Sequence, residues 1–294
     1  AVLAALNAAS GKVIDGGGLT YKCNSMLTPT SQNITVQNAT FDFSGVSATG
    51  GDGYIKFAGS AATATNLSGN ADVGNNTVTV ASTTGLTTPE SWHILKSNKI
   101  IDTTPSGSGL GSDLSLGQYI FLKSTNTTTK VLTLHNDIIY KFETGDTARV
   151  VPITMKKNIT FKNVIIKGAN PLGDTTSNGH VGLRFEYCEG ITIDNCTFED
   201  IDYAGTRLHY CVNGKVSNST FKHLTASGTA YGIIIAYGSY GVNVTNCYGQ
   251  DLRHLVTLGG IDGINLFVNV TNCHMTGCRD AGLDSHGAGD FVNF

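Results

Sequence analysis

The sequence predicts an all-β protein built as a solenoid, in which short parallel strands stack coil upon coil. Three observations predict this class. The 294 residues are rich in Gly (36), Asn, Thr and Ser and only 14% are charged, a composition that suits strands and turns better than helices. One ten-residue phrase recurs through the second half of the chain. A second short strand with alternating apolar and polar residues accompanies the copies.

The repeated phrase keeps an asparagine at its fifth position. Copies such as ITIDNCTFED and VNVTNCYGQD differ at most other positions. Successive copies in the second half are 23 to 32 residues apart, which is expected when turn lengths vary and the strands stay in register. Because coils stack about 4.8 Å apart, Asn at one turn position can form a hydrogen-bonded ladder. The marker residues are Asn38, Asn163, Asn195, Asn218, Asn246 and Asn272.

The chain is expected to divide into three parts. Residues 1–64 hold an Ala- and Leu-rich stretch that predicts a short capping helix ended by Gly11, followed by the first coils. Residues 65–151 break the phrase and predict a small inserted β module. Residues 152–294 form the main solenoid, which ends within a coil, so the chain is expected to be part of a longer protein.

The inserted module is expected to contain five short strands linked by a flexible Gly- and Ser-rich stretch at 105–117. Its GSGLGSD segment at 107–113 does not lie between a strand and a helix, so it predicts a loop and not a nucleotide site. The expected strands lie within 75–82, 92–100, 118–125, 130–139 and 148–153.

The seven cysteines favour free thiols over disulfides. Their number is odd, and Cys196, Cys247 and Cys273 each follow the marker Asn of the phrase. This shared position predicts a stack of buried thiols inside the solenoid. It also favours synthesis in a reducing compartment over the secretory route.

Several function classes are disfavoured by composition. The net charge is −3 and no Lys/Arg run is present, so the chain shows no nucleic-acid footprint. No apolar run approaches the length of a membrane span, and no signal peptide precedes the repeats. The cysteines and histidines do not have the spacing of a metal site. We therefore expect neither a metal nor another cofactor.

The second strand of each coil predicts a polar stripe on one outer face. It reads LRFEY at 183–187, TRLHY at 206–210 and IIIAY at 233–237, followed by RHLVTL at 253–258 and GLDSH at 282–286. Period two places the apolar residues inside and the charged residues outside. Arg253 and Thr257 are expected to point outward, with His254 at the bend before its strand. The tyrosines that end the first three strands are expected to pack as a stack.

At these motifs the chain resembles the right-handed parallel β-helices of the pectate-lyase type, and more closely the tailspike depolymerases of bacteriophages. The resemblance rests on GKVIDGGGLTYK after the short helix, on the β insertion, and on RHLVTLGG followed one coil later by GLDSHGAG. It implies a homotrimer in the virion tail, assembled in the bacterial cytoplasm, that binds and cleaves a bacterial surface polysaccharide. The calcium-binding Asp ladder of pectate lyases and the adjacent Asp pair of polygalacturonases have no counterpart here.

The polar stripe supplies the candidate site residues. Asp284, His286, Arg253 and His254 fall on two adjacent strands, and an Asp near His is an arrangement that tunes proton transfer, so these four are the candidate catalytic residues. Arg suits the carboxylates of acidic sugars. The candidate substrate-binding residues are Arg184, Glu186, Arg207, His209 and Thr257. An alternative for the Arg, Glu and His pairs among them is a ladder of exposed ion pairs without function.

The chemistry favours a lyase over a glycoside hydrolase. Glycosidases need two carboxyl groups roughly 5–9.5 Å apart, whereas Glu186 and Asp284 are four strands, or about 19 Å, apart. Asp251, Asp262 and Asp280 remain possible partners in turns that the pattern does not place. In a lyase, His286 or His254 would be the base and Arg253 would hold a uronate carboxylate. The alternatives are a non-catalytic receptor-binding spike and a secreted enzyme of the pectate lyase or polygalacturonase type.

Overall fold

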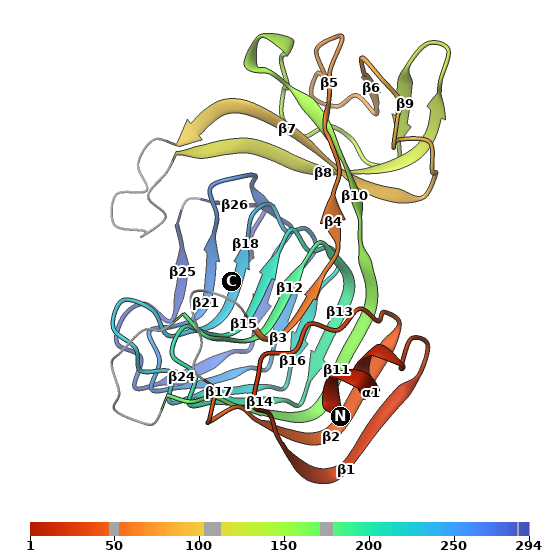
Figure 1. Cartoon of the computed structure of the whole chain (residues 1–294). Helices are drawn as coiled ribbons and strands as arrows, with labels where there is room; N and C mark the ends of the chain where they lie inside the picture. The colour runs from red at the N-terminus through yellow and green to blue at the C-terminus, as the bar shows by residue number, and fades with distance from the viewer. Residues whose placement is uncertain (47–52, 103–112, 171–178, 287, 294) are drawn as a thin grey trace.

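The computed structural model describes residues 1–46, 53–102, 113–170, 179–286 and 288–293. The described part of the chain is almost wholly β and forms a solenoid with a smaller antiparallel body beside it (Figure 1). The loop expected at 107–112 lies outside the described residues. The helix α1 spans Val2–Asn7, and the short 3-10 helix η1 spans Thr144–Asp146.

The larger solenoid sheet has eleven strands, and the pairings along it are parallel. The phrase of each coil forms two short strands that bend at the marker Asn, except in two early copies, where a single strand continues through it. The strands are β1 (Val13–Lys22), β2 (Ile34–Asp42), β11 (Lys156–Lys167), β13 (Cys188–Asp194), β14 (Thr197–Glu199), β16 (Lys215–Ser217), β17 (Thr220–Lys222), β19 (Asn243–Thr245), β20 (Tyr248–Gln250), β23 (Asn269–Thr271) and β24 (His274–Thr276).

A second solenoid sheet carries the alternating strands. Its order is β25-β21-β18-β15-β12-β3, and its pairings are parallel. Its strands are β3 (Gly53–Ala58), β12 (Val181–Glu186), β15 (Ala204–His209), β18 (Tyr231–Ala236), β21 (His254–Gly259) and β25 (Leu283–Ser285). A short third pair joins β22 (Asn265–Leu266) to β26 (Gly289–Asp290). These sheets confirm the predicted class of fold.

The marker asparagines all adopt the left-handed backbone conformation, with φ between 51° and 53°. Asn tolerates this region better than most residues, which explains its place at the bend. Their side chains form the predicted ladder: Asn246 donates to Asn218 at 3.1 Å, and Asn272 donates to Asn246 at 2.7 Å. The ladder has one interruption, because Asn218 donates to the Asp194 carboxylate instead of to Asn195.

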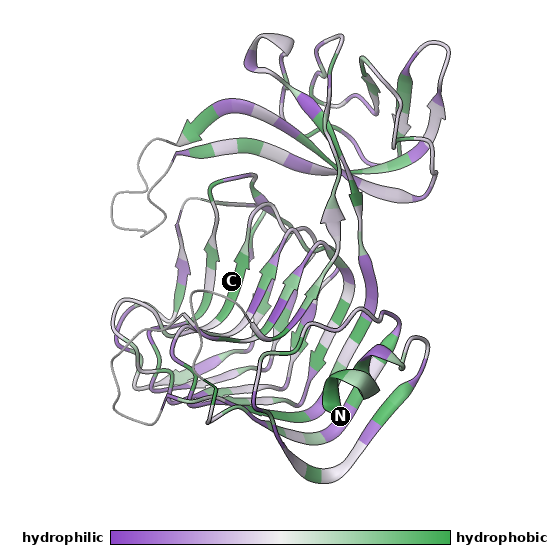
Figure 2. Ribbon diagram, in the orientation of Figure 1, coloured by the Kyte–Doolittle hydropathy of each residue, from purple (hydrophilic) through white to green (hydrophobic). Residues whose placement is uncertain are grey.

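The interior of the solenoid is a continuous apolar core. Alternating apolar and hydrophilic residues along its strands are visible in Figure 2. All seven cysteines are free, as predicted, and Cys196 and Cys247 are buried, whereas Cys273 is only half-buried on the last described coils. At the other end, Leu6 of α1 is buried against Ile14 and Phe41, so the predicted capping helix is confirmed.

The inserted module is an antiparallel sheet with its own apolar cluster. All five expected strands form, and two short strands add to them. The strands are β4 (Ser60–Ala61), β5 (Thr65–Asn66), β6 (Thr77–Thr79), β7 (Ser91–Asp102), β8 (Leu114–Asn126), β9 (Val131–Leu134) and β10 (Arg149–Thr154). Both ends of the insertion leave the solenoid together, because a Cβ at Gly59 would lie 2.2 Å from the Thr154 carbonyl oxygen.

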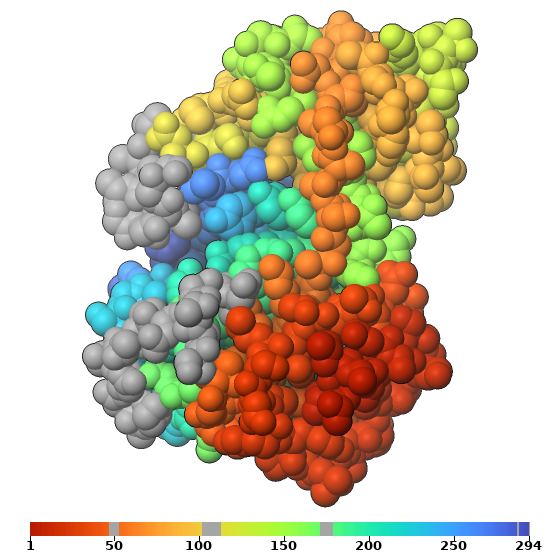
Figure 3. Space-filling model, viewed as in Figure 1, coloured from red at the N-terminus to blue at the C-terminus, as the bar shows by residue number. Residues whose placement is uncertain are grey.

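The module docks onto the turns at the end of the second sheet (Figure 3). Trp92 donates to Glu189 at 3.0 Å, and Lys96 forms an ion pair with Asp262. Ile264 and Leu266, from the solenoid, are buried in the module's apolar cluster. These contacts reach the late coils of the solenoid. None of the described helices is long and apolar enough to span a membrane.

Candidate functional site

The outer face of the second sheet brings the polar stripe into two rows. Strand register places Arg184, Arg207 and Thr257 in one row, which ends at Asp284. The neighbouring row runs from Glu186 through His209 and two small residues toward His286, whose backbone N–H donates to the Leu258 carbonyl. The first row is Lys56, Arg184, Arg207, Ile234, Thr257 and Asp284; the second is Ala58, Glu186, His209, Ala236 and Gly259.

A cleft of about 400 Å³ opens in the middle of this face. Its floor is formed by Ile234, Ala236 and Gly259. These residues are small or apolar, so the sheet surface is recessed there. Arg207 stands at one end, and His286 stands at the other. These two residues are three strands apart, or about 14 Å.

Three tyrosines that the pattern did not assign to the site line this cleft. Tyr203 lies beneath the Arg207 guanidinium at 5.4 Å, and Tyr231 stacks on His254 with ring centroids 5.6 Å apart. Tyr237, the third, packs against Tyr210 and also borders the cleft. The predicted packing of Tyr187, Tyr210 and Tyr237 as a stack is therefore confirmed, although Tyr237 also faces the groove.

Asp284 lies between two histidines. Its Oδ2 is 3.0 Å from Nε2 of His286 and 3.5 Å from Nε2 of His254. His254 is the first residue of β21 and is only 2% exposed, so it stands on the outer face under the cleft wall and not at a bend. The structure thus brings together the Asp and both His residues from the two adjacent strands.

The two histidines differ in the proton that each can exchange. Nδ1 of His254 contacts the Ala281 carbonyl oxygen, which can only accept, so Nδ1 carries a proton and Nε2 is the atom free to gain or lose one. Burial lowers the pKa of His286. Asp284 opposes this effect, and His254 reinforces it. His286 is therefore neutral near pH 7 and able to accept a proton.

Arg253 lines the cleft, but its guanidinium already has protein partners. Nη1 donates to the Gly228 carbonyl at 2.7 Å and to the Tyr231 hydroxyl at 3.2 Å. Nε lies 3.4 Å from Oδ2 of Asp280. These contacts hold Arg253 beside Tyr231, where its cationic charge borders the cleft.

Three buried polar atoms in this site have no hydrogen-bond partner among the described residues. They are Oγ1 of Thr257 and Nε2 of both His254 and His286. The histidine nitrogens lie at ion-pair distance from Asp284 without hydrogen-bond alignment. Because buried polar groups are nearly always paired, three such atoms around one cleft indicate a place for a polar ligand or water.

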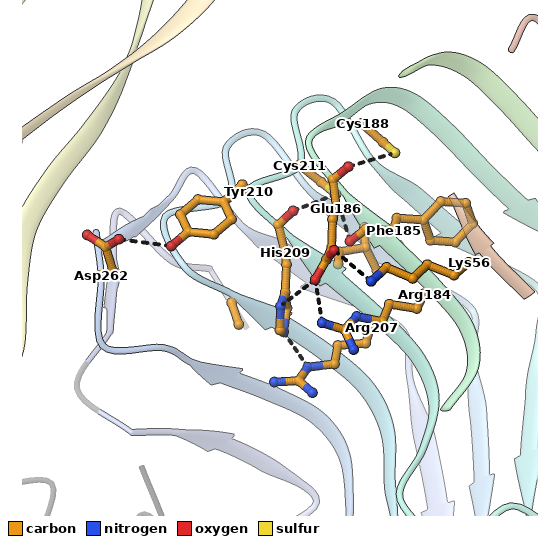
Figure 4. Close-up of polar contacts among 12 residues, drawn as sticks. Lys56, Arg184, Phe185, Glu186, Cys188, Arg207, His209, Tyr210, Cys211 and Asp262 are labelled. Atoms are coloured by element: carbon orange, nitrogen blue, oxygen red, sulfur yellow. Dashed lines mark hydrogen bonds and ion pairs between the residues drawn. The ribbon is translucent and has the colours of Figure 1, made fainter. Parts of the chain in front are cut away.

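The other end of the stripe carries a cationic cluster. Figure 4 shows Glu186 between Lys56 and Arg184, with a Lys56–Glu186 distance of 3.1 Å. Glu186 is partly desolvated, which opposes ionisation, but Arg184 and Lys56 overcome this effect and lower its pKa. Glu186 is therefore a neutralised carboxylate and a poor candidate for a catalytic acid. Among the described residues, Lys56, Arg184 and Arg207 lie together around Glu186.

His209 has a supporting position. It is 4% exposed, and Nε of Arg207 donates to its Nε2. Burial, followed by the nearby Arg207 and Arg184, holds the pKa of His209 well below its ordinary value. His209 is thus a neutral acceptor that fixes the Arg207 side chain.

Asp280 is the carboxylate that the sequence pattern could not place. Its Oδ2 lies 3.9 Å from Nε2 of His254, and Oδ2 of Asp284 lies 3.5 Å from the same nitrogen. The two oxygens are therefore no farther apart than the sum of these distances, which is compatible with a glycosidase pair. Asp262 is excluded from such a role, because Lys96 and the Tyr210 hydroxyl hold it at the module interface.

No group of three or more acidic, His or Cys side chains that could hold a metal ion is found in the described ranges. The chemistry that this arrangement permits is proton transfer by His254, His286 and the carboxyl groups, with Arg207 and Arg253 available to negative charge.

The family to which the chain belongs has the fold described above. Residues 117–293 match the family model described as the right handed beta helix region, so the chain belongs to this family. No curated protein matches the sequence.

Solved structures with the same fold include three bacteriophage tailspikes. The gp49 tailspike of Pseudomonas phage LKA1 superposes with a TM-score of 0.68 at 18% identity, covering 99% of this chain and 47% of that one. The gp61 tailspike of Pseudomonas phage phi297 gives 0.68 at 17% identity, covering 92% and 44%. The gp54 tailspike of Acinetobacter baumannii bacteriophage AP22, solved with A. baumannii capsular saccharide, gives 0.65 at 15% identity, covering 89% and 41%. The chain spans less than half the length of these tailspikes.

Proposed function

We propose that this chain is part of a phage tailspike that binds and cleaves an acidic bacterial surface polysaccharide along the outer face of its second sheet. The observation that carries the proposal is the cleft between Arg207 and His286, together with Asp284, which meets His286 and His254 at the end of that cleft. The shared fold with tailspikes, one of them solved with a capsular saccharide, supports the substrate class. The same resemblance supports a homotrimer in the virion tail that acts outside the bacterial cell.

The electrostatics of the face suit an acidic chain. Lys56, Arg184 and Arg207 follow one another on adjacent strands. Arg207 lies on Tyr203 at the edge of the cleft, where a carboxylate could accept from its planar guanidinium. An acidic polysaccharide that crosses the strands would therefore meet Arg207 about 14 Å from Asp284.

The residues around Asp284 support proton transfer by two routes. In a β-elimination, neutral His286 takes the proton beside a uronate carboxylate, and Arg253 stabilises the developing negative charge. The protonated His286 then gives that proton to the leaving oxygen as the C–O bond breaks, which returns His286 to its neutral form. In a hydrolysis, Asp280 and Asp284 act as the carboxyl pair. We favour elimination, because the backbone N–H of Ala281, followed by His254 and Arg253, lowers the pKa of Asp280, which leaves this carboxyl group ionised and a poor acid.

The test is cleavage of a panel of purified capsular and exopolysaccharides, with the products sized by chromatography. Shortening of at least one acidic member is the expected result. An unsaturated uronyl end that absorbs ultraviolet light identifies elimination, whereas oxygen-18 from solvent in a saturated end identifies hydrolysis. Tight binding of a polysaccharide without any shortening would overturn the enzymatic part and identify a receptor-binding spike.

A further inference from the structure

A second cleft, of about 260 Å³, lies where the inserted module meets the solenoid. It is separate from the site above and is lined by the beginning of β7, by the turn before it, by residues around the β10–β11 junction and by Glu189. Its volume is slightly below the range of roughly 300–1,000 Å³ that suits drug-sized ligands, so it has room for a single sugar unit.

Trp92 forms an apolar wall of this cleft. The indole is half-buried, and its Nε1 donates to Oε1 of Glu189 at 3.0 Å. Lys157 lies 3.3 Å from the other Glu189 oxygen, so the carboxylate is held from two sides. Ile153 and Met155 extend the apolar surface beside the ring.

His93 supplies a buried acceptor. The Ser91 hydroxyl donates to the Thr88 carbonyl, so its only proton is engaged, and Nε2 of His93, 3.0 Å away, must donate to it. Nδ1 therefore carries a lone pair. Burial lowers the pKa of His93 to about 4, which keeps the ring neutral at pH 7. His93 is 3% exposed, and its Nδ1 has no partner in the part of the chain that the structure describes.

The chemistry of the lining selects among sugars. A ligand here must offer an N–H or O–H donor for Nδ1 of His93, hydroxyl groups for Thr88 and Thr154, and an apolar group for the surface of Trp92, Ile153 and Met155. An N-acetylated hexosamine has all three, since its acetamido group joins an N–H to a methyl. A plain hexose and a hexuronate both lack the methyl and the N–H of the acetamido group.

We propose that this cleft is a second, non-catalytic saccharide site that binds one N-acetylated hexosamine unit. The inference rests on the proposed function only for the source of the sugar, a unit of the polysaccharide that the solenoid face engages. Two separated sites on one chain would hold a long polymer between cleavage events and raise the effective concentration of its next segment at the solenoid cleft.

The chain contains one tryptophan, so its tryptophan fluorescence reports directly on Trp92. Titration with N-acetylglucosamine to roughly 10 mM should give a saturable change in intensity or wavelength, because millimolar dissociation constants are expected for single sugars. Glucose and glucuronic acid at the same concentrations should give changes at least several-fold smaller. No saturable change with N-acetylglucosamine would overturn the proposal.

Substitutions in the cleft test whether the sugar that changes the fluorescence binds there. His93→Phe keeps an aromatic ring but removes the acceptor and should weaken binding at least tenfold. Thr154→Val, at an exposed position that tolerates substitution, should weaken it several-fold. Unchanged titrations in both variants would put the sugar elsewhere and overturn the proposal. Asp284→Asn should titrate like the parent protein. Loss of the response in that variant would contradict two separate sites. A sugar response in a parent protein that cleaves no polysaccharide would instead refute only the proposed enzymatic function.

Discussion

Asp284 stands between two histidines whose protons are controlled differently. The Ala281 carbonyl fixes the proton of His254 on Nδ1, whereas burial keeps His286 neutral. The sequence could predict that Asp284 and His286 share an outer face, because they are two residues apart on one strand. It could not predict the contact between His254 and Asp280, since Asp280 lies in a turn outside the strand pattern and is bonded to Arg253.

The pH dependence of cleavage tests the role of His286. As a base it is active when neutral, and its pKa is lowered, so kcat/KM should stay near its maximum down to about pH 6.5 and fall at lower pH. The measurement is the pH profile of initial cleavage rates. A fall in kcat/KM centred well above pH 6.5 would contradict this assignment. So would a His286→Gln variant with the same kcat/KM values and the same pH profile as the parent protein.

His209 makes the fold sensitive to acid. Its pKa in the folded protein is held well below 6.5 by burial, so the unfolded chain takes up a proton first as the pH falls. Stability from this group is complete above pH 6.5 and is lost as the pH drops below it. Thermal unfolding should show the melting temperature falling between pH 7 and 5, and less steeply in His209→Gln. Equal slopes in both proteins would refute this explanation.

At the scale of the strand, the repeated phrase was the most reliable guide. It predicted the stacking, the Asn ladder and the inward cysteines, because each depends on a period that a solenoid keeps in every coil. The second sheet was less regular. Tyr231 lines the outer cleft while Ile233, two residues later, is in the core, and the pairing skips Gly232 between them. Strict alternation fails there, and for this reason Tyr231 and His254 were not placed on the face.

The Asn ladder offers a test in which backbone and side-chain effects separate. Asn246 has a φ of 53° and takes part in two side-chain hydrogen bonds, to Asn218 and from Asn272. Asn246→Gly keeps the backbone conformation and removes the bonds, at about 1 kcal/mol each. Asn246→Ala also adds the left-handed strain of roughly 1 kcal/mol. Chemical denaturation should rank parent, Gly and Ala in falling stability, and equal stability of parent and Gly variant would show that the ladder contributes nothing.

At the scale of the whole molecule, the module and the solenoid share an interface that also borders the cleft. Asp262, held by Lys96 and Tyr210, lies two residues beyond Gly260, which lines the cleft. The sequence predicted an insertion with five strands, since its strands alternate locally. It could not predict where the insertion docks, because the contacts between Trp92 and Glu189 or Lys96 and Asp262 join residues far apart in the chain.

Removal of the module tests how far the solenoid folds alone. Gly59 and Thr154 are adjacent, so a short linker can replace residues 62–151 without moving the strands on either side. The shortened protein should keep its β-sheet circular dichroism and unfold cooperatively. Its melting temperature should be lower by several degrees, because Ile264 and Leu266 become exposed. Non-cooperative unfolding would show that the module is an integral part of the solenoid core.

The central claim, that the outer face cleaves polysaccharide at Asp284, is tested most directly by comparing Asp284→Asn with Arg207→Ala on a cleaved substrate. Initial rates and binding of the same polymer are measured for both, with circular dichroism to confirm the fold. Asp284→Asn should lose roughly three or more orders of magnitude in rate with little change in affinity, as expected when a group orienting a proton-transfer His is altered. Arg207→Ala should mainly weaken binding. Full cleavage by a variant with Ala at 253, 254, 284 and 286 would contradict the account and place the reaction on another face.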